Sequence, residues 1–130
     1  MQTKILYVED EPFIANALVR VLEQAGYHVE VAVDGEKGVE LANKEIFDLV
    51  LLDLILPRID GFEVLRQLKE GSATKNIPVI ILSNLSTEED KKKAKDLGAL
   101  DFMVKAFANP LDIADRVKHL IGPGSANTGG

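Results

Sequence analysis

The sequence contains no cysteine, which excludes disulfide bonds, thiol catalysis and thiolate metal ligands. Its two histidines, His28 and His119, are distant in the chain and cannot form a zinc site by themselves. Long apolar runs are also missing, since the first one extends only from Ile5 to Val8. We therefore expect neither a signal peptide nor a membrane span.

Positive charge is in deficit, with 15 Lys and Arg against 21 Asp and Glu and a net charge of −6. This balance repels a phosphate backbone and disfavours direct binding to nucleic acid. No Gly-x-Gly-x-x-Gly motif follows a predicted strand, so a dinucleotide-binding fold lacks support. The 130 residues, 46% hydrophobic and 28% charged, fit one soluble, acidic, cytoplasmic domain with a single core.

Short apolar blocks alternate with stretches of helical periodicity. Near-continuous apolar blocks are typical of parallel strands that are covered on both faces, and they occur at residues 5–8, 49–52 and 79–82. In residues 29–33 valines alternate with Glu30 and Ala32, which predicts an edge strand with one wetter face. Residues 102–104 form a fifth, shorter block.

Five helices are predicted between and after these strands. They are expected in residues 14–25, 39–42, 62–68, 87–97 and 110–121. Apolar residues repeat at helical spacing in four of these ranges, and a capping pattern marks the start of residues 87–97. Ser86 and Glu89 are predicted to form a capping box, and Asn109 to cap the last helix with Pro110 in its first position. Strands alternating with helices predict an α/β fold with a parallel sheet and right-handed crossovers.

The chain ends in a glycine-rich segment, residues 122–130, without apolar periodicity. We interpret it as a flexible tail or linker remnant. The folded domain is therefore expected to span residues 1–121.

Polar side chains directly follow four of the five predicted strands. Glu9 and Asp10 follow the first, Asp53 the third, Ser83 the fourth and Lys105 the fifth. Because ligand sites of parallel sheets lie beyond the carboxyl ends of the strands, we expect these groups to meet at one rim.

Clustered carboxylates repel one another unless a cation neutralises them or one is protonated, and Mg²⁺ suits carboxylate and phosphate oxygens. A carboxylate can act as a nucleophile and form an aspartyl-phosphate. A lysine and a hydroxyl nearby would contact the remaining phosphoryl oxygens. Taken singly, each of these residues has an ordinary structural explanation, and Asp60 is expected to be a turn or cap residue. The shared position of the strand-end groups nevertheless favours a phosphoryl site.

Four segments resemble the receiver domains of the two-component response-regulator family, and the match extends over residues 3–121. They are Ile-Leu-Tyr-Val-Glu-Asp-Glu-Pro at 5–12, Leu-Val-Leu-Leu-Asp-Leu-Ile-Leu-Pro-Arg-Ile-Asp-Gly at 49–61, Val-Ile-Ile-Leu-Ser-Asn at 79–84 and Gly-Ala-Leu-Asp-Phe-Met-Val-Lys at 98–105. The resemblance implies a three-layer, flavodoxin-like fold with strand order 2-1-3-4-5 and five helices on both faces of the sheet.

The resemblance also implies the role of each site residue in a phosphorylated signalling switch. Asp53 would be the phosphoacceptor, and Mg²⁺ would be bound by Glu9, Asp10, Asp53 and the backbone carbonyl of Ile55. Ser83 and Lys105 would contact the phosphoryl group, and Ser83 and Phe102 would transmit the switch.

The same resemblance implies the partners. A sensor histidine kinase or phosphotransfer protein would donate the phosphoryl group from a phosphohistidine. The fourth helix, fifth strand and fifth helix would present the signal to a downstream protein or effector domain. The domain would not be an enzyme for an external substrate and would catalyse only its own phosphorylation and dephosphorylation.

Three residues depart from the family pattern. Ala106 follows Lys105 where the family usually has proline, often after a cis bond. Because a cis bond before a non-proline residue costs roughly 2.5–4 kcal/mol, the bond is either trans or part of a strained loop. Phe102 stands where tyrosine is common, and Asn84 stands where a small residue is preferred.

Other functions remain open to different degrees. The main alternative is a pseudo-receiver that acts as a protein interaction module without phosphorylation. A haloacid-dehalogenase-like phosphatase is disfavoured because Ile55, two residues after Asp53, cannot donate a proton. A flavin-binding carrier is disfavoured because the acids at residues 9–11 would repel a phosphate.

Overall fold

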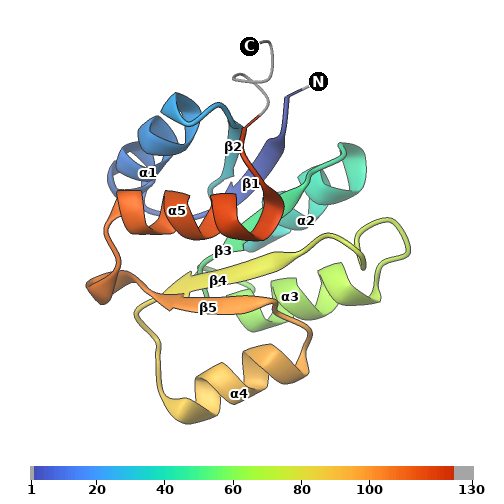
Figure 1. Cartoon of the computed structure of the whole chain (residues 1–130). Coiled ribbons are helices and arrows are strands. Elements are labelled where there is room, and N and C mark those ends of the chain that lie inside the picture. The colour runs from blue at the N-terminus through green and yellow to red at the C-terminus, as the bar shows by residue number, and fades with distance from the viewer. Residues whose placement is uncertain (1, 125–130) are drawn as a thin grey trace.

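Five strands and five α-helices alternate along residues 2–124, the part of the chain that the computed structural model describes (Figure 1). The strands are β1 (Lys4–Val8), β2 (His28–Ala32), β3 (Leu49–Leu52), β4 (Val79–Ser83) and β5 (Asp101–Val104). The helices are α1 (Pro12–Gln24), α2 (Gly35–Lys44), α3 (Gly61–Glu70), α4 (Glu88–Asp96) and α5 (Pro110–Ile121). A short 3₁₀ turn, η1 (Lys105–Phe107), was not predicted.

The sheet has the strand order β2-β1-β3-β4-β5, and every neighbouring pair is parallel. Both the α/β class and the order implied by the resemblance are confirmed. Val8 pairs with Leu52, and Ser83 pairs with Val104. The carboxyl ends of these strands therefore lie at one edge of the sheet.

Helices cover both faces of the sheet and make three layers (Figure 1). Ile5 and Tyr7 of β1 belong to a buried cluster with residues of α1 and α5. Leu6 and Val8 alternate with them and belong to a second cluster with residues of α2, α3 and α4. Burial on both faces explains why the central strands have near-continuous apolar sequences.

Strand β2 lies at the edge of the sheet, as predicted, but its burial differs from the valine alternation. Val29 and Ala32 are buried, whereas Val31 is 36% exposed and Val33, which lies beyond the strand, is 56% exposed. Val29 packs in the cluster that includes α1, while Ala32 packs on the opposite face. The alternation of valines therefore predicts the edge position of β2 but not which of its residues are buried.

Two of the predicted capping residues begin their helices, and a third prediction needs correction. Asn109 caps α5 in a capping box with Asp112, and Pro110 takes the first position. Asp60 caps α3. The capping box of α4, however, is formed by Thr87 and Asp90, so the predicted pairing of Ser86 with Glu89 is wrong. Both pairs have the right spacing, but the helix begins one residue later, at Glu88.

The glycine-rich segment starts with residues that contact the domain. The Tyr27 hydroxyl donates to the carbonyl of Gly122 over 2.5 Å, and Gly124 is buried against Gly26. Residues 125–130 of the predicted tail lie outside the described residues. Among residues 2–124, each helix is too short or too polar to cross a membrane.

Candidate functional site

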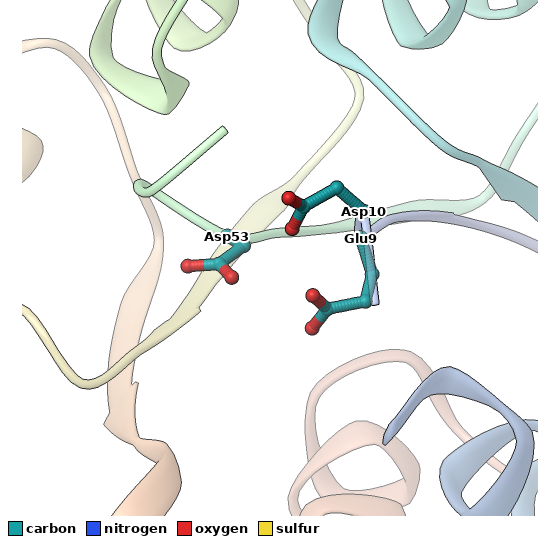
Figure 2. Close-up of side chains that lie close together, drawn as sticks. All are labelled: Glu9, Asp10 and Asp53. Carbon is teal, nitrogen blue, oxygen red and sulfur yellow. The ribbon is translucent and has the colours of Figure 1, made fainter. Parts of the chain in front are cut away.

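Three carboxylates gather at the carboxyl edge of the sheet. Glu9 and Asp10 follow β1 directly, and Asp53 follows β3, which is paired with β1. Each side chain offers an oxygen, and these oxygens all lie within 4.8 Å of one another. Figure 2 shows the three carboxylates beside one another at the ends of the two strands. The sequence prediction that these acids meet is therefore confirmed.

The three acids differ in their exposure to solvent. Glu9 is fully buried and Asp53 is 5% exposed, whereas Asp10 is exposed. Glu9 Oε1 accepts a hydrogen bond from the Tyr7 hydroxyl over 3.2 Å, and Glu9 Oε2 accepts one from the backbone N–H of Glu11 over 3.2 Å. The Glu9 carboxylate is thus held in place while Asp10 faces the solvent.

Asp53 is oriented by its own loop and by a cation. Its Oδ1 accepts a hydrogen bond from the backbone N–H of Ile55 over 3.1 Å. Its Oδ2 lies 2.8 Å from Nζ of Lys105, and the same ammonium also forms an ion pair with Glu9 Oε1. A carboxylate oxygen of Asp53 therefore lies in the centre of the site, next to a positive charge.

Burial alone would lower the pKa of Lys105, but its hydrogen bonds with Asp53 and Glu9 outweigh that effect, and the pKa is raised. The ammonium therefore stays charged at neutral pH.

The peptide bond between Lys105 and Ala106 is trans, as are all peptide bonds among the described residues. Of the trans bond and the strained cis loop that the sequence left open, the structure has the trans bond. The Lys105 side chain is directed into the acid cluster rather than toward solvent.

The charge and the donor atoms of the cluster fit a divalent cation. Three carboxylates and the single ammonium of Lys105 give a formal charge of −2. Carboxylate oxygens are the donors that Mg²⁺ prefers, and Mg²⁺ needs only a few of them besides water and phosphate oxygens. The part assigned to the carbonyl of Ile55 stays a prediction.

Ser83 and Phe102 take different places relative to the acids. Ser83 is fully buried at the end of β4, and its Oγ accepts a hydrogen bond from the backbone N–H of Leu85 over 3.2 Å. Phe102 is half-buried in β5 and packs against the cluster that includes Ala94 of α4. Ser83 therefore ends a strand at the site edge, while Phe102 connects β5 with α4.

Sequence reasoning missed the hydroxyl that supports Glu9. Tyr7 is 1% exposed, and burial, reinforced by the charge of Glu9, raises the pKa of its phenol. The hydroxyl therefore remains a donor to Glu9. Because side chains two residues apart on a strand share a face, the position of Tyr7 two residues before Glu9 was the available signal.

An ion pair between loops was also missed. Arg58, in the loop after Asp53, has a φ of 65°, which is unusual for a residue other than glycine. Its guanidinium lies 2.6 Å from Asp34 Oδ2 and 3.3 Å from Glu36 Oε1. Asp34 caps α2 through the N–H of Lys37, and this hydrogen bond, with Arg58, lowers the pKa of Asp34. Arg58 thus ties the loop that follows Asp53 to the start of α2.

Comparison with curated proteins finds relatives among transcriptional regulators. The chain is 43% identical over 104 residues to the DNA-binding dual master transcriptional regulator RpaA of Synechocystis, covering 80% of this chain and 43% of that protein. It is 38% identical over 123 residues to the transcriptional regulatory protein CusR of Escherichia coli, covering 95% of this chain and 53% of that protein. The chain therefore spans about half the length of the curated relatives it matches.

Solved structures and a family model agree with the fold. The chemotaxis protein CheY4 of Vibrio cholerae superposes with a TM-score of 0.86 and 31% identity, covering 92% of this chain and 99% of the other. The sequence model of the response regulator receiver domain matches residues 5–118. The resemblance seen in the motifs is confirmed: this chain belongs to the response regulator receiver domain family.

Proposed function

We propose that this domain is a phosphorylation-dependent switch of a two-component phosphorelay and that Asp53 is its phosphoacceptor. The observation that supports this most strongly is the contact of the Lys105 ammonium with Asp53 Oδ2 over 2.8 Å inside a cluster of three carboxylates. A carboxylate that is almost buried, next to a cation and beside a potential metal site, is suited to receive a highly charged group.

In the proposed transfer, an oxygen of the Asp53 carboxylate attacks the phosphorus of a phosphohistidine. The new P–O bond forms as the P–N bond breaks, and the electron pair leaves with the imidazole, which takes up a proton. Mg²⁺ held by Glu9, Asp10, Asp53 and the Ile55 carbonyl would neutralise charge on the phosphoryl oxygens. Lys105 would move its contact from Asp53 to a phosphoryl oxygen. The domain would thus catalyse only its own phosphorylation and dephosphorylation.

Ser83 and Phe102 would connect the site to a surface. We propose that the Ser83 hydroxyl leaves the Leu85 N–H and binds a phosphoryl oxygen, which shifts the loop between β4 and α4. Helix α4 has one buried side chain, Ala94, so its displacement exposes little apolar surface and should cost little free energy. Phe102, packed in the cluster that contains Ala94, would change its environment with that displacement.

The proposed partners follow from the same assignment. A sensor histidine kinase or phosphotransfer protein would supply the phosphohistidine, and α4, β5 and α5 would contact a downstream protein or effector domain. That this domain makes no direct contact with nucleic acid stays a prediction based on its net charge of −6. The relative RpaA is named as a DNA-binding regulator, but this chain covers only 43% of the length of that protein.

The test is to incubate the chain with Mg²⁺ and a small acyl phosphate and to map added phosphate by mass spectrometry. One phosphate on Asp53, lost in Asp53→Asn and retained in the surface control Asp115→Asn, is expected. No modification of the wild-type chain, or an unchanged modification in Asp53→Asn, would overturn the proposal. The absence of any modification would favour the alternative of an interaction module that works without phosphorylation, whereas an unchanged modification in Asp53→Asn would place the phosphate on another residue.

A further inference from the structure

The two residues that depart from the family pattern around Lys105 contact each other. Oδ1 of Asn84 accepts a hydrogen bond from the backbone N–H of Ala106 over 2.7 Å. Asn84 follows the last residue of β4, and Ala106 lies in η1 just after Lys105. A proline at residue 106 would have no N–H to donate, so this bond needs the alanine as much as the asparagine.

We propose that Asn84 is a positioning residue: its side chain fixes the main chain next to Lys105 and thereby sets how the ammonium meets Asp53. This inference rests on the proposed function insofar as it concerns phosphorylation. Its structural part concerns only the contact of Asn84 with Ala106 and the place of Lys105.

The sheet fixes only one side of Lys105. Val104, the residue before it, is paired with Ser83 at the end of β4. Beyond Lys105 the strand pairing ends, and the turn contains a long hydrogen bond of 3.4 Å from the Ala108 N–H to the Lys105 carbonyl. The bond from Ala106 to Asn84 ties this second side of Lys105 back to β4.

Packing gives the turn little support where it faces α1 and α5. A pocket of about 330 Å³ lies beside Asn84, Ala106 and Ala108, with Ile14 of α1 and Pro110 of α5 in its wall. The small side chains of the two alanines leave this space open. A directional hydrogen bond, rather than filled volume, is therefore what holds residue 106 in place.

The consequence for Lys105 follows from its flexibility. A lysine side chain loses much rotamer freedom when it is held in one geometry, and Lys105 has to reach both Glu9 and Asp53. If the main chain on both sides is fixed, the ammonium has fewer arrangements to search. The contact with Asp53 is then formed more often and in one orientation.

The test compares two variants of nearly the same size. Asn84→Leu removes the acceptor, and Asn84→Asp keeps an oxygen that can accept from Ala106. Hydrogen exchange of the Ala106 amide should accelerate about three- to tenfold in Asn84→Leu, the effect of one exposed hydrogen bond, and stay near the wild-type rate in Asn84→Asp. Asn43→Leu removes another side-chain amide that bonds a backbone carbonyl, that of Val39, and serves as the control.

Two further readouts separate positioning from general stability. The NMR signal of the Lys105 ammonium should shift in Asn84→Leu and not in Asn43→Leu, and the rate of Asp53 phosphorylation should fall about three- to tenfold in Asn84→Leu alone. Equal Ala106 exchange in Asn84→Leu and the wild type would overturn the proposal, as would an unmoved Lys105 signal. If the wild-type chain takes no phosphate, the proposed function fails, and the exchange and Lys105 measurements still decide the role of Asn84.

Discussion

Gly61 lies so close to Asp53 that there is no room for a side chain between them. A Cβ added to Gly61 would stand 2.2 Å from the carbonyl oxygen of Asp53 and 2.5 Å from Cα of Leu54. The Gly61 N–H also donates to the Leu54 carbonyl over 2.9 Å. The start of α3 therefore rests directly on the backbone of Asp53 and Leu54.

Gly61→Ala should lower the free energy of unfolding by about 1–3 kcal/mol, because an added methyl group has to displace backbone atoms that the sheet holds in place. Urea unfolding checks this. Gly38→Ala is the comparison, since its Cβ would meet a side-chain methyl group of Val8 at 2.8 Å rather than backbone atoms, and alanine favours a helix interior. A loss no larger in Gly61→Ala than in Gly38→Ala would contradict the close approach as a constraint.

Mg²⁺ should raise the thermal stability of the domain, because the acid cluster exists only in the folded state. At a concentration ten times the Kd, the gain should be about 1.4 kcal/mol. Asp10→Asn should abolish most of this gain, and Asp115→Asn on the exposed surface of α5 should keep it. Thermal denaturation with and without Mg²⁺ measures both, and an undiminished gain in Asp10→Asn would show that the ion binds elsewhere.

Lys105→Met should have opposite effects on the apo domain and on metal affinity. Without the ammonium, three carboxylates face one another uncompensated, so the metal-free domain should lose stability. For the same reason Mg²⁺ should bind several-fold more tightly. Calorimetric titration with Mg²⁺ checks the affinity, with Lys91→Met of α4 as control. Weaker Mg²⁺ binding in Lys105→Met would mean that Lys105 does not compete for the acid oxygens.

Arg58 combines an unfavourable backbone conformation with two ion pairs, and two substitutions separate these effects. Arg58→Ala removes the contacts with Asp34 and Glu36 and keeps a Cβ at a φ of 65°. Arg58→Gly removes the same contacts and the steric cost. Arg58→Gly should therefore be the more stable of the two by about 1–2 kcal/mol. Equal unfolding free energies would show that the loop relaxes in one of the variants.

The free energy of unfolding at acid pH should depend on Glu63. Its hydrogen bonds with Arg66, then with Gln67, lower its pKa to about 2 from the usual 4.5. A carboxylate with a lowered pKa stabilises the fold above its unfolded pKa and loses this effect as pH falls through its folded pKa. Stability of the wild type should thus decline between pH 4.5 and 2 more steeply than that of Glu63→Gln. Urea unfolding at several pH values between 4.5 and 2 compares the two chains, and equally steep declines would contradict this prediction.

Much of the fold could be predicted from the sequence because strands buried on both faces carry continuous apolar blocks. Residues 49–52 match β3 in full, and the Asn109 cap places the start of α5. Where two patterns were equally good, as with Ser86 and Thr87, the sequence did not decide between them. The burial of β2 depended on how α1 covers it and could not be derived from the alternation of valines.

The sequence by itself determined which chemical groups follow each strand, and parallel pairing was enough to bring Glu9, Asp10 and Asp53 to one edge. Only the tertiary structure decided how these groups are held. The Tyr7 hydroxyl on Glu9 and the bond between Asn84 and Ala106 join side chains to atoms whose positions are set by packing and by the ends of neighbouring strands. Alternation along a strand fixes the face of a residue, whereas a hydrogen bond requires a position within a few tenths of an ångström, which depends on the whole fold.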